Sequence, residues 1–233
     1  MKTLDTIPVR IDIDDVKAKL RNGDWDMVQR LLDQETPLIR PKAVYRIASV
    51  TDTHEDALDV DGVLLKSRVL RRHVDKGTRV FPFVVTIGNG PDQRADASQD
   101  LPEKFYVDTI QNLALTRARV YLTDHLKRRF PADHLSHLSP GSIADWPLEA
   151  QQPLFSLLGS APDRIGVQLN DHFIMSPIKS VSGIFFPTHI PFHSCQLCPR
   201  DPCQGRRAEY DRDLAREYRI ECSIELVTAI FSV

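Results

Sequence analysis

Three cysteines near the C-terminal end of the sequence have the spacing of metal ligands. Cys195, Cys198 and Cys203 form a Cys-x2-Cys-x4-Cys pattern that is interrupted by turn-forming prolines. Thiolates are soft ligands that suit zinc or an iron–sulfur cluster, so the pattern predicts that the three bind one such centre together. Spacing alone leaves the choice between zinc and a cluster open, and it also allows three unconnected cysteines.

The spacing does not identify a fourth ligand. Cys222 is one candidate, but it falls on the apolar positions of an alternating segment, where a buried structural cysteine is the commoner interpretation. His189 and His193 are alternatives, and a cluster with an open coordination position is compatible with the same pattern.

A turn-rich segment, residues 138–148, is a second candidate. Pro140-Gly141 predicts a tight turn where the backbone approaches a ligand closely. Asp145 is expected to cap the helix that follows this turn. Residues 165–186 combine strand patterns with small polar side chains, and composition alone favours a strand pair with a capped turn.

Composition excludes several classes of protein. The 233 residues are 42% hydrophobic and 27% charged, which is enough for one sizeable core. The 30 Lys and Arg against 32 Asp and Glu give a net charge of −2, so we expect no nucleic-acid or membrane partner. No apolar run reaches the roughly 18 residues of a transmembrane helix, and no signal peptide is evident, so we expect a cytoplasmic protein.

The elements that must position these residues follow from hydrophobic periodicity. We expect an N-terminal helical arm over 1–37 and one domain over 38–233 with the cysteine motif at 193–207. The predicted strands are 43–50, the hairpin 57–65 around Asp61-Gly62, 80–87, 165–169, 181–186 and 220–226. The predicted helices are 69–74, 103–129, 148–158 and 208–218, with 131–147 as a loop. This order predicts an α+β fold with a mostly antiparallel sheet.

Several short motifs keep their order and spacing over residues 139–183. They are Ser139-Pro140-Gly141, Trp146-Pro147-Leu148, Ile165-Gly166-Val167, Met175-Ser176-Pro177 and Ser180-Val181-Ser182-Gly183. Together they resemble the activation domain of cobalamin-dependent methionine synthase, and more closely the short stand-alone proteins that carry this domain. The resemblance extends over about 40–187 and implies an α+β fold with a twisted antiparallel sheet. Several stand-alone members also resemble this chain in the cysteine pattern followed by arginines.

The resemblance implies a function in cobalamin chemistry. In methionine synthase this domain binds S-adenosylmethionine and presents its methyl group to cobalt. An inactive cob(II)alamin is rescued by one-electron reduction coupled to methylation. For this chain, the resemblance implies S-adenosylmethionine as cofactor and cobalamin carried by a partner. The implied partners are a cobalamin-binding methyltransferase or corrinoid protein, and an electron donor protein.

The resemblance also implies a set of cofactor-binding positions. These are His137, Gly141, Ser142, Asn112, Phe185 and Phe186. His137 stands where the family has an arginine, and Ser142 where it has a tyrosine. We expect Gly141 and Phe185 to line one cleft, and His137 to hold a ligand carboxylate better near pH 6, where imidazole gains charge.

Our hypothesis is an activation-type partner of a corrinoid-dependent methyltransferase that supports S-adenosylmethionine-dependent reductive reactivation of cobalamin on another protein. The alternative is a non-enzymatic metal- or cluster-containing module that docks on a corrinoid protein without binding S-adenosylmethionine. The departures at His137 and Ser142 favour the alternative, because neutral histidine does not replace a guanidinium fork. Whether the chain is itself an enzyme is left open, and no catalytic residue is indicated.

Overall fold

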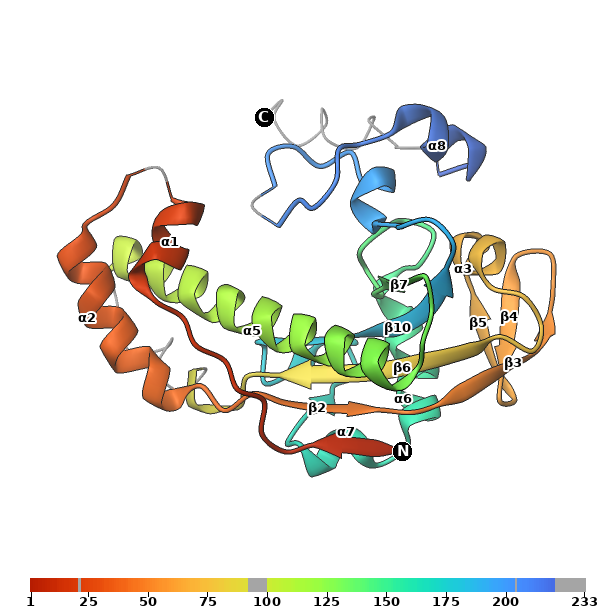
Figure 1. Ribbon diagram of the computed structural model, residues 1–233, viewed down its shortest axis with the longest axis horizontal. Coiled ribbons are helices and arrows are strands. Elements are labelled where there is room, and N and C mark those ends of the chain that lie inside the picture. Colours follow the sequence, from red (N-terminus) through yellow and green to blue (C-terminus); the bar gives the residue numbers. More distant parts are fainter. Residues whose placement is uncertain (21, 92–99, 204, 221–233) are drawn as a thin grey trace.

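A computed structural model describes residues 1–20, 22–91, 100–203 and 205–220 (Figure 1). The strands are β1 (Lys2–Leu4), β2 (Lys42–Tyr45), β3 (Ala48–Thr53), β4 (Ala57–Val60), β5 (Val63–Lys66), β6 (Arg79–Thr86), β7 (His134–Leu138), β8 (Gln168–Leu169), β9 (Met175–Ser176) and β10 (Ser180–Thr188). The helices are α1 (Ile13–Lys19), α2 (Trp25–Glu35), α3 (Arg68–His73), α5 (Leu101–Arg129), α6 (Gln151–Leu158), α7 (Ala161–Arg164) and α8 (Arg212–Glu217). Short 3-10 turns cover Thr36–Leu38, Leu148–Ala150 and Ser194–Leu197.

One curled antiparallel sheet organises the described chain. Strand β6 lies at its centre and pairs with β2, with β10 and, through its first residues, with β3. The sheet continues from β2 to β1, from β10 to β7, and from β3 to the hairpin β4–β5, while β8 and β9 form a separate ribbon. The predicted α+β class is therefore confirmed.

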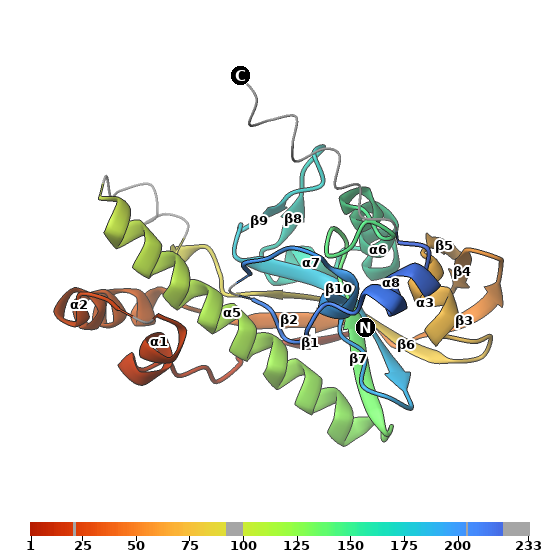
Figure 2. The same ribbon diagram turned by 90° about the horizontal axis from the view of Figure 1, so that it is seen from above.

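Helices cover both faces of this sheet. Phe83 and Val85 of β6 pack with Ala118 and Leu122 of α5, whereas Val84 between them packs on the opposite face, with α6 and α7. Figures 1 and 2 show α5 on one side of the sheet and α6 with α7 on the other. Neighbouring strand residues point to opposite faces, so the apolar run of β6 is buried from both sides. Among the described helices, none is long and apolar enough to cross a membrane.

The N-terminal helices form where the sequence predicts them. Asp12 caps α1 in a capping box with Asp15, and Asp24 caps α2. Both helices pack on α5 in a cluster that includes Val28, Leu31 and Ile110. Residues 2–4, within the expected helical arm, form β1 and pair with β2, while the domain boundary at residue 37 stays a prediction.

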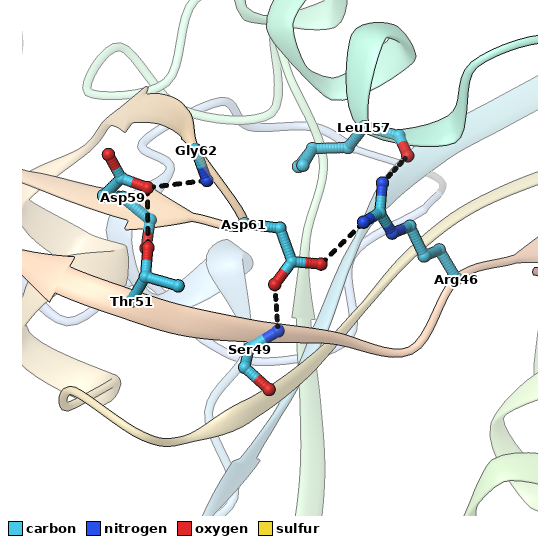
Figure 3. Close-up of polar contacts among 7 residues, drawn as sticks. All are labelled: Arg46, Ser49, Thr51, Asp59, Asp61, Gly62 and Leu157. Atoms are coloured by element: carbon cyan, nitrogen blue, oxygen red, sulfur yellow. Dashed lines mark hydrogen bonds and ion pairs between the residues drawn. The ribbon is translucent and has the colours of Figure 1, made fainter.

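The Asp61-Gly62 turn confirms the predicted hairpin. Both residues have positive φ angles, 47° and 86°, as a tight hairpin turn requires. The Asp61 carboxylate accepts hydrogen bonds from the backbone N–H of Ser49 at 3.1 Å and from Arg46 Nη2 at 2.8 Å (Figure 3). Arg46 also donates through Nη1 to the carbonyl of Leu157 at 2.9 Å, which ties the hairpin to α6.

Four local predictions need correction or fall outside the described chain. Residues 131–147 were expected to be a loop, but they contain β7, an edge strand whose polar residues hide the alternation. The strand expected over 165–169 is reduced to β8, because Gly166 turns the chain with φ 78°. Helix α8 is shorter than the expected 208–218, and the strand expected over 220–226 lies almost wholly outside the described residues.

Candidate functional site: a basic cleft beside helix α5

A cleft of about 400 Å³ lies between α5, the strand pair β7–β10 and the loop that holds the cysteines. We call it the basic cleft, and we call residues 193–207 the cysteine loop. The cleft is lined by Lys19, Thr109, Asn112, Leu113, Leu115, Thr116, Arg119, His137, Ser139, Val181, Gly205, Arg206 and Arg207. Every charged residue in this lining is basic.

Helix α5 supplies one wall of the cleft. Thr109, Asn112, Thr116 and Arg119 recur at spacings of three and four residues, which places them on one face of a helix. The amide of Asn112 is held in place, because its oxygen accepts from Lys179 Nζ at 3.0 Å and its nitrogen donates to Asp108 at 2.8 Å. This wall therefore presents hydroxyl, amide and guanidinium groups.

Strands β7 and β10 form the base. His137 and Phe185 are cross-strand neighbours, and their rings lie 5.3 Å apart between centroids. Phe185 is fully buried and stacks on Phe83, with ring centroids 4.3 Å apart. The imidazole of His137 thus rests on a rigid aromatic layer.

The cysteine loop is fastened to β7 at the rim of the cleft. His193 forms a parallel β-bridge with His137, and the N–H of Phe192 donates to Ser136 Oγ at 3.1 Å. Inside the loop, the guanidinium of Arg206 donates to the carbonyls of Cys195, Cys198, Arg200 and Ala208. One arginine thereby connects carbonyl groups from several parts of the irregular loop backbone.

Two arginines converge on His137 from distant parts of the chain. Arg119 Nη1 lies 3.2 Å from His137 Nε2, and Arg207 Nη1 lies 3.1 Å from the same nitrogen. Because a guanidinium only donates hydrogen bonds, Nε2 must be an unprotonated acceptor. This geometry assigns His137 as neutral, with its proton on Nδ1.

The electrostatics agree with that assignment. Burial lowers the pKa of His137 well below its usual 6.5, and the charges of Arg119 and Arg207 lower it further. Burial, followed by Arg207, also lowers the pKa of Arg119 from 12.5 to about 10, while Cys195 acts in the opposite direction. Burial and two neighbouring cations therefore both disfavour the gain of charge near pH 6 that the sequence predicts for His137.

The structure brings together some of the expected cofactor-binding residues and separates others. Asn112 and His137 both line the basic cleft. Gly141 and Ser142 lie in the turn after β7, outside the lining, where Ser142 Oγ donates to the carbonyl of Ser139 at 2.6 Å. Phe185 lies beneath His137 rather than in the lining.

Phe186 points away from the cleft. It packs on the opposite face of β10, with its ring 5.6 Å from that of His73. Successive strand residues face opposite sides, so Phe185 and Phe186 cannot both serve one cleft.

The described geometry does not support the predicted zinc or iron–sulfur centre. Cys195, Cys198 and Cys203 are half-buried free thiols in one loop. Across the ranges that the structure describes, no three His, Cys, Asp or Glu side chains are placed to hold a metal ion. Cys222, the candidate fourth ligand, lies outside the described residues.

Sequence reasoning missed much of the cleft. The residues not singled out as ligand-binding include Lys19, Thr109, Thr116, Arg119 and Val181. Helical spacing from Asn112 would have reached Thr109, Thr116 and Arg119, since residues three, four and seven apart share a face. No local pattern identifies Arg207, because its approach to His137 depends on long-range folding.

No family model matches the sequence, and no curated protein matches it. Among solved structures, the fold is similar to that of a reactivation domain. The matching structure is a crystal structure of the MetH reactivation domain bound to AdoHcy, with a TM-score of 0.57 and 17% sequence identity. The match covers 72% of this chain and 66% of that chain, and at this identity it establishes the fold.

Proposed function

We propose that this chain is an activation-type partner of a corrinoid-dependent methyltransferase. It binds S-adenosylmethionine and supports the reductive reactivation of a cobalamin that another protein carries. A separate donor protein supplies one electron to cob(II)alamin. The methyl group then moves from the sulfonium sulfur to cobalt, and S-adenosylhomocysteine is left behind.

The observation that carries this proposal is the fold shared with the MetH reactivation domain, which was solved with AdoHcy. The basic cleft supplies a place for such a ligand. Its volume of about 400 Å³ lies within the range of small-molecule sites. Leu113, Leu115 and Val181 give it apolar surface, while Thr109, Asn112 and Ser139 offer hydrogen-bonding groups.

Filling the cleft tests the proposal. Val181 is half-buried on β10 and lines the cleft, so Val181→Phe places a ring in the space that the ligand would occupy. We expect the affinity for S-adenosylhomocysteine to fall at least about tenfold, because a bulky side chain competes directly for the site. Isothermal titration calorimetry on the full chain measures the change.

Val120→Phe is the matched control. Val120 lies on α5 but is 46% exposed and is not in the cleft lining. The Val120→Phe variant should therefore bind S-adenosylhomocysteine as tightly as the unaltered protein does. Thermal unfolding of both variants checks that the fold persists. Equal binding by Val181→Phe and the unaltered protein would place the ligand elsewhere.

Protonation of His137 is expected to contribute almost no pH dependence to the affinity for S-adenosylhomocysteine between pH 6 and pH 8. The pKa of His137 is well below 6.5, so the imidazole is neutral across this interval and its proton occupancy does not change on binding. Titrations at pH 6 and pH 8 should differ by less than about twofold, far below the tenfold change that one pK unit represents. A tenfold tightening at pH 6 that disappears in His137→Asn contradicts this.

A docking module that does not bind S-adenosylmethionine is the second candidate function. The charged lining of the cleft consists of Lys19, Arg119, Arg206 and Arg207, and this observation favours the second candidate. A sulfonium cation entering this lining meets only like charges, which is unfavourable in a partly buried site. If neither S-adenosylmethionine nor S-adenosylhomocysteine binds when each is titrated by calorimetry, the result favours this second function.

A further inference from the structure

Two guanidinium groups share a single neutral acceptor at the wall of the basic cleft. Arg119 and Arg207 both donate to His137 Nε2, at 3.2 and 3.1 Å. A guanidinium carries five N–H donors, so one shared bond to an imidazole leaves most of this capacity unused. In the described ranges, neither guanidinium forms an ion pair with a carboxylate.

Holding two guanidinium charges this close together is energetically unfavourable unless an anion lies near them. Arg119 is partly buried, and its neighbour Arg207 is a like charge, so both burial and repulsion disfavour its charged state. Buried charges in proteins are normally paired or bound to a ligand of opposite sign. The lining contains no Asp or Glu that could supply this charge. Within the part of the chain that the structure describes, no carboxylate pairs with either guanidinium, and a bound anion would supply the missing negative charge.

We propose that Arg119 and Arg207 form an oxyanion subsite of the basic cleft, with neutral His137 as the spacer that keeps the two guanidiniums together. The subsite takes a carboxylate or a phosphate, because both present oxygens that match the planar donors of arginine. His137 rests on Phe185, and the cysteine loop that carries Arg207 is bonded to β7. Both arginines are thus positioned by the fold.

For a carboxylate, this inference rests on the proposed function. S-adenosylhomocysteine carries an α-carboxylate at its amino-acid end, and 5′-methylthioadenosine is the same nucleoside thioether without that end. Comparing the two isolates the contribution of the amino-acid end. Inorganic phosphate tests the other source of oxyanion independently of any S-adenosyl ligand.

The experiment is calorimetry of all three probes with the full chain and with Arg119→Gln and Arg207→Gln. The unaltered protein should bind S-adenosylhomocysteine at least about tenfold more tightly than 5′-methylthioadenosine, the scale of one charge-assisted hydrogen bond. Each glutamine variant should lose this preference while its affinity for 5′-methylthioadenosine stays the same. Arg128→Gln, at an exposed position of the same helix, should keep the preference.

The outcomes separate the subsite from the proposed function. Phosphate that binds to the unaltered protein and not to Arg119→Gln, with no S-adenosyl binding, supports the subsite and rejects the proposed ligand. S-adenosylhomocysteine that binds equally to the unaltered protein and both glutamine variants keeps the proposed function and overturns the subsite. Absence of binding by every probe overturns both. Arg119→Lys, which keeps the charge and loses the fork, gives a second test if Arg119→Gln does not fold.

Discussion

Gly183→Ala is expected to lower the free energy of unfolding by about 3 kcal/mol, at the upper end of overpacking effects. A Cβ atom at this position would lie 2.4 Å from the carbonyl oxygen of Leu138 and 2.9 Å from both Phe83 Cε1 and Ser139 Oγ. The nearest of these atoms belongs to the backbone, so relief requires β7 to move away from β10. Chemical denaturation followed by circular dichroism measures the loss.

The same change should disturb the basic cleft. His137 and Ser139 reach the cleft through β7 and its following residue, so displacement of β7 moves both. For stability, Gly205→Ala is the matched control, because a Cβ there meets only Cys203 Sγ, at an ordinary 3.9 Å. We expect Gly205→Ala to change stability by no more than about 0.5 kcal/mol. Similar losses for the two variants would contradict the close approach at Gly183.

Asp145→Ala is expected to cost about 2–3 kcal/mol of folding stability, because it removes the acceptor of hydrogen bonds from the buried Ser67 hydroxyl and the buried Val69 N–H. The Asp145 side chain is 3% exposed. Its carboxylate accepts from Ser67 Oγ at 2.7 Å, from Arg68 Nε at 3.0 Å and from the backbone N–H of Val69 at 3.1 Å. These bonds tie the turn after β7 to the start of α3.

Asp213→Ala provides the control for Asp145. Asp213 pairs with Arg216, but the two side chains are 92% and 70% exposed, so the pair is expected to contribute about 0–1 kcal/mol. Denaturant titrations of both variants give the comparison. If Asp145→Ala is no less stable than Asp213→Ala, the network around α3 is not a significant source of stability.

The role of Asp145 shows how local sequence reasoning fails. The sequence predicts that Asp145 caps the helix that follows it, since Asp is a favoured capping residue. In the structure it caps α3 instead, where Ser67 already accepts from the N–H of Leu70. A carboxylate near any helix N-terminus satisfies unpaired N–H groups, and the fold determines which helix is within reach.

Elements whose signals are local could be predicted from the sequence. The Asp61-Gly62 turn needs only residues that tolerate positive φ, and the apolar stripe of α5 needs only helical periodicity. Strand β7 escaped prediction because its short, polar segment has no pattern of its own. It becomes a strand by pairing with β10, more than forty residues away in the chain.

The candidate site divides in the same way. The resemblance of the motifs pointed to Asn112 and His137, and both line the basic cleft. The positive charge of that cleft, by contrast, depends on the tertiary structure. Arg119 lies on a helix and Arg207 in the cysteine loop, and only the packing of α5 and the loop against β7 brings both to His137 Nε2. Sequence by itself determined the α+β elements, because hydrogen bonding and periodicity act over a few residues. The tertiary structure decided which cations share the imidazole acceptor of His137, because that depends on contacts between residues far apart in the chain.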